Sequence, residues 1–231
     1  MGRPAVSGPK ILDLFCGEGG AGWGYHLAGW DVVGVDVSPA CTRRYPLDSI
    51  PFDALEYLAA HSREYDAIHA SPPCQRYSHG TVAGHAHKHP DLIGATREAL
   101  LATGLPYVIE NVPRAPLVEP ITLCGTMFGL TATDDDGTLL HLQRHRLFES
   151  NVKLAAPRHE HPSGVQWAGS YGGARRDKHE ARHVRKGGYV PSKPVQERLM
   201  GVAWMTQKGL YESIPPAYTE HIGRQLLEVV A

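Results

Sequence analysis

The sequence predicts an α/β fold, with a mostly parallel sheet and helices on both of its faces. Short apolar runs typical of buried strands recur at residues 10–15, 30–36, 65–70 and 106–113,. The first run opens into a glycine-rich turn and then into a helix that should end at Gly29,. A second predicted helix starts after the second run, with Ser38 as its N-cap and Pro39 at its first position,. Strands that alternate with helices favour a parallel sheet whose strands end at a common edge.

The chain has 231 residues, which suits one large domain or one domain with a small insertion,. Its net charge of −1 gives no overall sign of a nucleic-acid partner. However, residues 151–190 carry eight Lys and Arg against three Asp and Glu. This segment is either a local basic footprint for a polyanion or a solvated loop.

The number and spacing of the cysteines, together with the lack of long apolar runs, indicate the cellular compartment of the protein. The four cysteines (Cys16, Cys41, Cys74 and Cys124) form no Cys-x-x-Cys pair, so neither a zinc ribbon nor a disulfide scaffold is predicted,. Free thiols fit a reducing cytoplasm. Because the sequence offers no signal peptide and no membrane-spanning run, we expect a cytoplasmic protein without membrane contact.

No metal site is predicted. The histidines His85, His87 and His89 lie in a glycine-hinged polar loop, where no cysteine or carboxylate has a matching ligand spacing,. Solvated side chains or phosphate contacts explain them better. Cys124 is expected to be a small buried hydrophobe.

A thiol follows the apolar run at 65–70. Pro72 and Pro73 end that run because they lack backbone donors, and Cys74 comes next,. Ligands of open α/β sheets bind at this carboxyl edge, so Cys74 is a candidate nucleophile. Glu110 ends another predicted strand and should lie beside Cys74, where a carboxyl group can hold and pass on a proton,.

The glycine-rich turn indicates a bound cofactor. Asp36 ends the second strand about 20 residues after the first glycine of the turn, a spacing that suits a ribose diol. Asp13 and Glu18 beside the turn argue against a phosphate and favour a cationic group, as in S-adenosyl-L-methionine. Asp53 is consistent both with an acceptor for an adenine amine and with a helix N-cap,.

Four short motifs occur in order: DLFCGEGG at 13–20, PCQ at 73–75, ENV at 110–112 and RHR at 144–146. Together they resemble the cytosine carbon-5 DNA methyltransferase family, in its compact phage and bacterial form. The resemblance implies the Rossmann-like fold of S-adenosylmethionine-dependent methyltransferases with a small target-recognition insertion. It implies a catalytic and cofactor-binding domain at 1–150, a target-recognition region at 151–193, and a segment at 194–231 that packs back.

The resemblance also implies a reaction. Cys74 would add to carbon 6 of a flipped-out cytosine and thereby make carbon 5 nucleophilic. Glu110 would hydrogen-bond ring nitrogen 3 and the exocyclic amine, Arg146 would contact the base oxygen, and Arg144 would support the site. The transferred methyl group would come from S-adenosyl-L-methionine.

Cofactor and DNA contacts follow from the same resemblance. The expected cofactor-binding residues are Asp13, Phe15 (stacked on adenine), Gly17, Gly19, Gly20, Asp36 (on the ribose), Asp53 and Pro73. The expected DNA-binding residues are Gln75, Ser78, Arg175, Arg176, Lys178, Arg182, Arg185 and Lys186.

Several readings stay open. RNA could replace DNA as the substrate, a related cofactor could donate a modified methyl group, or the chain could be a catalytically silent DNA-binding relative. We expect a monomer that acts on double-stranded DNA. The resemblance also allows for a cognate restriction endonuclease as a partner.

Overall fold

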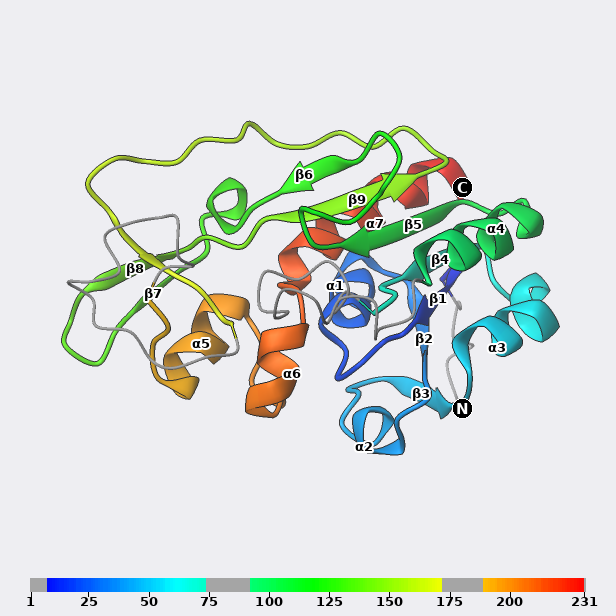
Figure 1. The fold of residues 1–231 in the computed structure, drawn as a ribbon, viewed down its shortest axis with the longest axis horizontal. Helices are drawn as coiled ribbons and strands as arrows, with labels where there is room; N and C mark the ends of the chain where they lie inside the picture. The colour runs from blue at the N-terminus through cyan, green and yellow to red at the C-terminus, as the bar shows by residue number, and fades with distance from the viewer. Residues whose placement is uncertain (1–7, 74–91, 172–188, 231) are drawn as a thin grey trace, which may run out of the picture.

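The protein is described by a computed structural model that covers residues 8–73, 92–171 and 189–230 (Figure 1). Its strands are β1 Lys10–Leu14, β2 Asp31–Asp36, β3 Asp48–Pro51, β4 Ala67–Ala70, β5 Tyr107–Asn111, β6 Ile121–Leu123, β7 Thr131–Thr133, β8 Leu139–Leu142, β9 Arg146–Ser150 and β10 Gln166–Ala168. Its helices are α1 Gly20–Ala28, α2 Pro39–Thr42, α3 Ala54–His61, α4 Ile93–Thr103, α5 Lys193–Met200, α6 Gln207–Glu212 and α7 Pro216–Val230, with short 3₁₀ turns η1 Ser62–Glu64 and η3 Gly125–Phe128.

Within these residues the main sheet has seven strands in the order β3-β2-β1-β4-β5-β9-β6. Strands β1 to β5 are parallel, whereas β9 runs antiparallel to both β5 and β6. Because β1, β2, β4 and β5 are parallel, their carboxyl ends share one edge, and the strand order reverses between β1 and β4. This edge is where open α/β sheets bind their ligands. The predicted mostly parallel α/β sheet is confirmed.

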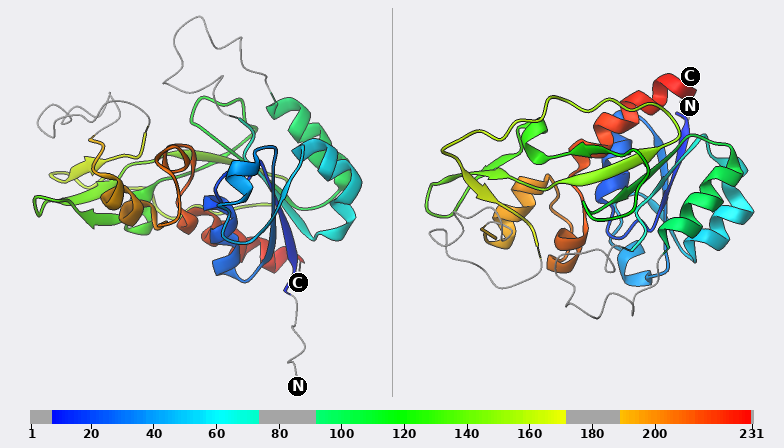
Figure 2. Two further views of the ribbon diagram at one scale, coloured as in Figure 1. Left: turned by 90° about the horizontal axis from the view of Figure 1, so that it is seen from below. Right: turned by 45° about the horizontal axis from the view of Figure 1, so that its top comes forward.

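Helices cover both faces of the main sheet (Figure 2). Successive strand residues point to opposite faces, so Ile11 of β1 belongs to one apolar cluster and Leu12 to the other,. The Ile11 cluster includes residues of α1 and α7, such as Tyr25 and Ile222. The Leu12 cluster is completed by residues of α3 and α4. Two separate apolar cores therefore hold the sheet rigid beneath its carboxyl edge.

Helix α7 packs against residues from the first half of the chain. Ile222 and Leu226 are fully buried, and Leu227 and Val230 pack against the same cluster. The Trp30 indole donates to the Gly223 carbonyl at 2.9 Å across 193 residues of sequence. No helix in the described ranges is both long and apolar enough to cross a bilayer.

A second, smaller sheet has the order β10-β8-β7 and lies beside the main sheet. It shares an apolar cluster with α5 and with residues as far along the chain as Leu210. The two sheets thus divide the chain at other points than the expected boundaries at 150 and 193. The β7–β8 hairpin precedes residue 150 but belongs to the small sheet, because β8 pairs with β10, which comes after β9. Likewise α5 and α6 follow residue 193 but pack with the small sheet.

Candidate active site

A buried carboxyl group and a guanidinium group meet at the carboxyl end of β5. Arg146 Nε on β9 is 3.1 Å from Glu110 Oε1, and both side chains are about nine-tenths buried, at 10% and 9% exposure. Burial raises the pKa of Glu110, and this outweighs the opposing effects of Arg146, a hydrogen bond from Ser71, and Arg144,. The site therefore holds a carboxyl group that is biased toward keeping its proton, next to a fixed positive charge.

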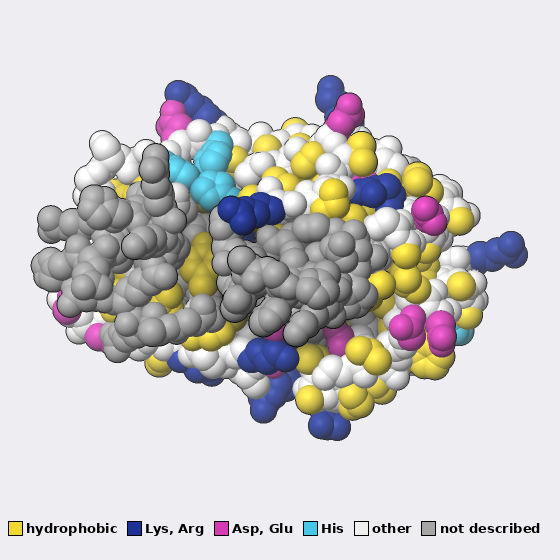
Figure 3. Space-filling view, in the orientation of Figure 1, with side chains coloured by type: hydrophobic (Ala, Val, Ile, Leu, Met, Phe, Trp, Pro, Cys, Tyr) yellow, Lys and Arg dark blue, Asp and Glu magenta, His cyan; other side chains and the backbone are white. Residues whose placement is uncertain are grey.

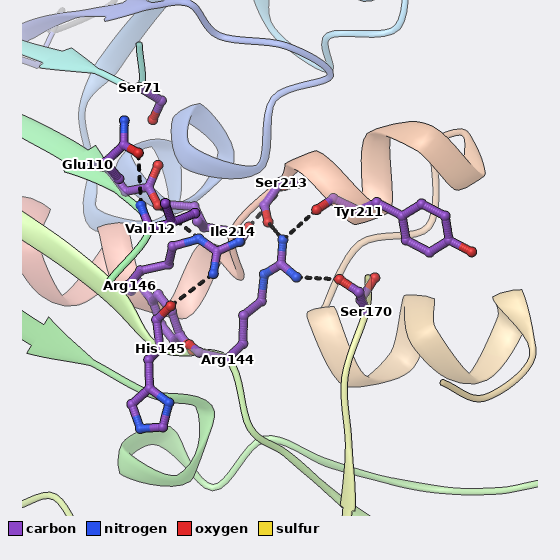
Figure 4. A network of polar contacts seen from close by, with 12 residues as sticks. Ser71, Glu110, Val112, Arg144, His145, Arg146, Ser170, Tyr211, Ser213 and Ile214 are labelled. Carbon is purple, nitrogen blue, oxygen red and sulfur yellow. Dashed lines mark hydrogen bonds and ion pairs between the residues drawn. The ribbon is translucent and has the colours of Figure 1, made fainter. Parts of the chain in front are cut away.

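Arg144 has a different role from Arg146, as Figure 4 shows. Its guanidinium is fully buried and donates to the carbonyls of Ser170, Tyr211 and Ser213. The Arg144 carbonyl in turn accepts a 2.6 Å hydrogen bond from the Tyr218 hydroxyl. Arg144 thus joins the small sheet to the α6–α7 connection, which agrees with a supporting role.

The chain that leads to Cys74 is fixed at the end of β4. Asn111 Nδ2 donates to the Pro72 carbonyl at 2.9 Å, so the end of β5 holds the segment two residues before the thiol. Pro73 is the last described residue of this segment. Cys74 itself lies outside the described residues, and so do the histidines His85, His87 and His89. The same holds for the residues predicted to bind DNA, which are Gln75, Ser78, Arg175, Arg176, Lys178, Arg182, Arg185 and Lys186.

A buried histidine under this edge was missed in the sequence. His69 Nδ1 lies 2.9 Å from the Tyr25 hydroxyl, and its Nε2 lies 2.9 Å from the Ser71 hydroxyl. Ser71 also hydrogen-bonds Glu110. Burial lowers the pKa of His69 from 6.5 to about 3, so the ring is neutral. A histidine inside the apolar run at 65–70 was the signal for it.

At the end of β1 the backbone of the glycine-rich turn lies next to the Asp36 carboxylate at the end of β2. Phe15 and Gly17 both have positive φ, 57° and 53°, and a Cβ at Gly17 would meet nothing within 4 Å. The Gly17 amide donates to Asp36 Oδ2 at 3.0 Å, and the Ser38 amide donates to Asp36 Oδ1 at 2.8 Å. The turn and the end of β2 are thereby held together, with open space above Gly17.

The other two glycines of the turn pack against protein. Gly19 caps α1 in the left-handed conformation, with φ 93°, and a Cβ there would strike Pro46. A Cβ at Gly20 would strike the Ser213 hydroxyl and the Ile214 carbonyl of the α6–α7 connection. Gly20 therefore allows α1 and the C-terminal segment to approach closely.

The acids near the turn have protein partners. Asp13 is fully buried and accepts a 2.8 Å hydrogen bond from the Tyr45 hydroxyl, and burial raises its pKa from 3.8 to about 7. Glu18 accepts from the Thr206 amide and the Thr206 hydroxyl, both at 2.6 Å, so it anchors the start of α6. Asp53 accepts from two amides as the N-cap of α3, which confirms that alternative. Its contact with adenine stays a prediction.

Comparison with known proteins rests on three-dimensional structure, since no family model and no curated protein sequence matches the chain. Three solved structures each cover 96% of this chain and 99% of their own. They are a protein named as a DNA modification methyltransferase encoded within a prophage (E. coli; TM-score 0.62, 13% identity), the Entamoeba histolytica methyltransferase EhMeth (0.60, 11%) and the S. pombe Dnmt2 methyltransferase (0.59, 13%). At this identity the likeness shows the fold. The chain has the Rossmann-like fold of these methyltransferases over nearly its whole length.

Proposed function

We propose that the protein is a DNA cytosine-5 methyltransferase that uses S-adenosyl-L-methionine. One observation carries this proposal. The buried Glu110–Arg146 pair lies at the same sheet edge as the Pro72–Pro73 segment, and Cys74 directly follows that segment in the chain. A thiol, a protonated carboxyl group and an arginine are the groups that nucleophilic addition to a cytosine ring needs.

Each protein group then has a defined task. The Cys74 thiolate forms a bond to carbon 6, and the ring electrons shift toward nitrogen 3 and the base oxygen. Glu110 donates its proton to nitrogen 3, and burial favours this role because it raises the pKa of the carboxyl group,. Arg146 stabilises negative charge at the base oxygen. Once carbon 5 carries the methyl group, nitrogen 3 returns its proton to Glu110 and the carbon-5 proton passes to water. Departure of the thiolate then restores the aromatic ring.

The turn after β1 fits the methyl donor. Gly17 leaves open space where a side chain would otherwise stand, and the Asp36 carboxylate is held beside it by two backbone amides. A carboxylate fixed in this way has lone pairs left for a ribose diol. S-adenosyl-L-methionine, when bound, supplies an electrophilic methyl group. Gly17, Asp36 and the backbone around Phe15 would hold it.

A nucleic acid fits the charge of the chain, and DNA is preferred to RNA because of one structural neighbour. Residues 151–190 carry a basic excess in an otherwise acidic chain, which suits phosphate contacts in either polymer,. One structural neighbour is named as a DNA modification methyltransferase. A cytosine in a duplex must leave the base stack to reach a group on the sheet edge.

A labelling experiment tests the proposal. The protein is incubated with methyl-labelled S-adenosyl-L-methionine and, in separate reactions, with double-stranded DNA and with RNA. We expect label in DNA, at carbon 5 of cytosine by bisulfite sequencing, and loss of label for Cys74→Ser but not for the control Cys41→Ser. Label confined to RNA would change the substrate. Absence of label with DNA binding intact would contradict methyl transfer from S-adenosyl-L-methionine, and the mass of cytosines in DNA from cells that express the protein then separates another donor (a modified cytosine) from a silent relative (unmodified cytosine).

A trapping experiment isolates the nucleophile. DNA containing 5-fluorocytosine has no carbon-5 proton to lose, so the thiol adduct should persist after transfer. We expect a covalent protein–DNA band with the wild type and none with Cys74→Ser. A band that persists in Cys74→Ser would remove Cys74 from the mechanism.

A further inference from the structure

Four potential metal ligands converge beside the active-site arginines. They are Cys124 after β6, His145 before β9, and His159 and His161 on the connection between β9 and β10. One ligand atom from each lies within 4.8 Å of all the others. Figure 3 shows histidine side chains gathered at one place on this face, and Figure 4 shows His145 pointing away from the Arg146 guanidinium.

The separations match a tetrahedral site. With Zn–N bonds of about 2.0–2.1 Å and a Zn–S bond of about 2.3 Å, two nitrogens lie about 3.3 Å apart and sulfur lies about 3.6 Å from nitrogen. His145 Nε2 is 3.3 Å from His159 Nε2, and Cys124 Sγ is 3.6 Å from His161 Nε2. The Nε2 atoms of His159 and His161 are slightly closer, at 2.9 Å.

Hydrogen bonding alone accounts poorly for this arrangement. The Nε2 atom of each neutral imidazole is either a donor or an acceptor, so hydrogen bonds satisfy the three short contacts only where N–H groups or lone pairs are shared between two neighbours,. Protonating the rings would instead bring positive charges together. A cation at the centre satisfies all four atoms, and sulfur with imidazole nitrogen is a ligand set typical of zinc.

The surroundings also suit a bound ion. The outer nitrogen of His161, Nδ1, lies 3.5 Å from Gln143 Nε2, and turning the Gln143 amide by 180° would place its oxygen there to accept the Nδ1 proton of a metal-bound ring,. Cys124 is fully buried, so its sulfur is shielded from solvent. Between β9 and β10 the chain has no regular helix or strand over residues 151–165, and a metal ion is one way to fix such a long connection,.

We propose that Cys124, His145, His159 and His161 bind a zinc ion in a closed, four-coordinate structural site. The ion fixes the irregular connection to the end of β6 and to the segment between the two arginines. Arg146 Nη1 donates to the His145 carbonyl at 2.8 Å, so a fixed His145 also fixes the Arg146 side chain. The sequence predicted no metal site, because the four ligands come from separate segments rather than from one short motif. The proposed zinc site replaces that prediction.

Metal content is the direct test. Untagged protein, purified without added chelator, should contain about one zinc per chain, as a closed four-ligand site requires. The double variant His159→Ala/His161→Ala should lose at least about tenfold in zinc content, since removal of second-shell partners alone costs 10–100-fold in affinity. The control His61→Ala removes an exposed histidine outside the group and should keep its zinc. Zinc that is absent from the wild type, even after dialysis against zinc, or that is retained in the double variant would overturn the site.

Cobalt substitution tests the ligand set without reference to activity. Co²⁺ in place of zinc should give the intense visible absorption of a tetrahedral site and a thiolate-to-cobalt charge-transfer band. Cys124→Ser should lose the charge-transfer band. A spectrum typical of six-coordinate cobalt, or a charge-transfer band that survives in Cys124→Ser, would contradict the assignment, and so would a different tightly bound native metal.

Discussion

Asn111 Nδ2 donates to the Pro72 carbonyl at 2.9 Å, and this buried hydrogen bond joins the ends of two neighbouring parallel strands. Asn111 Oδ1 is also occupied, since it accepts from the Val112 amide at 2.9 Å. The side chain is therefore locked, and it locks the backbone two residues before Cys74. A catalytic thiol needs this kind of support, because small displacements of a nucleophile are costly.

Replacing Asn111 should affect the reaction more than its contribution to stability suggests. Asn111→Ala leaves the Pro72 carbonyl without its partner, which should lower the free energy of unfolding by about 1–3 kcal/mol. Displacing the Cys74 segment should lower kcat by up to about 100-fold. The measurements are single-turnover methyl transfer and urea unfolding.

Asn151 provides a matched control at the other end of β5. Its side chain accepts from the Tyr107 amide at 2.8 Å and donates to the Leu105 carbonyl at 2.9 Å. Asn151→Ala should be destabilised by a similar amount but keep its kcat. Equal losses of kcat in both variants would mean that Asn111 acts only through overall stability.

Glu110 should give the reaction an alkaline limb in its pH profile. Burial raises the pKa of this carboxyl, and the protonated form is the one that donates to nitrogen 3, so kcat should fall as pH rises through that pKa. Glu110→Gln keeps a donor but cannot pass on a proton. It should lower kcat by about 10²–10⁴-fold and remove the alkaline limb.

Glu149→Gln is the control that distinguishes loss of a catalytic carboxyl group from replacement of a buried carboxyl group. Glu149 is more deeply buried than Glu110 and pairs with Arg97, with Oε1 2.6 Å from Nε. Glu149→Gln should destabilise the protein while leaving the alkaline limb in place. An unchanged limb in Glu110→Gln would assign that titration to another group.

His69 should make the fold sensitive to acid. Its pKa is lowered by burial from 6.5 to about 3, so the neutral ring is favoured in the folded state. This contribution to stability is complete above pH 6.5 and is lost as pH falls from there toward about 3,. His69→Gln keeps a donor and an acceptor for Tyr25 and Ser71 but does not titrate. Its free energy of unfolding should fall less than that of the wild type between about pH 7 and about pH 5.

The exposed residue His61 is the control for that measurement. His61→Gln alters a partly exposed side chain, 42% accessible, that pairs with Glu64 at the surface. Its curve of unfolding free energy against pH shows what replacing a histidine outside the core does by itself. If the His69→Gln curve matches the wild type, His69 is not the group that titrates.

Local patterns explain what the sequence could predict. Glu110 and Asp36 both end apolar runs, and a strand end fixes their position with little help from distant residues. The helix α7 face was readable from its spacing for the same reason. Functional residues at the end of a strand can therefore be predicted from a single sequence.

Contacts between distant segments explain the rest. The β7–β8 hairpin joins the small sheet because of β10, and Glu18 binds Thr206 across 188 residues. The ligand set of Cys124, His145, His159 and His161 is likewise assembled from three segments. Nothing in local spacing indicates such pairings, so only the three-dimensional arrangement shows them.

Two glycines of the same turn should respond differently to alanine. Gly17→Ala meets no neighbour but must adopt a φ of 53°, which costs about 1–2 kcal/mol and puts a methyl group into the proposed cofactor space,. Gly20→Ala instead strikes the Ser213 hydroxyl and the Ile214 carbonyl, and this overpacking should cost about 1–3 kcal/mol,. Calorimetric titration with S-adenosyl-L-methionine and thermal unfolding separate the two effects. Gly17→Ala should weaken cofactor binding far more than Gly20→Ala at similar stability, and equal binding by both variants would move the cofactor away from Gly17.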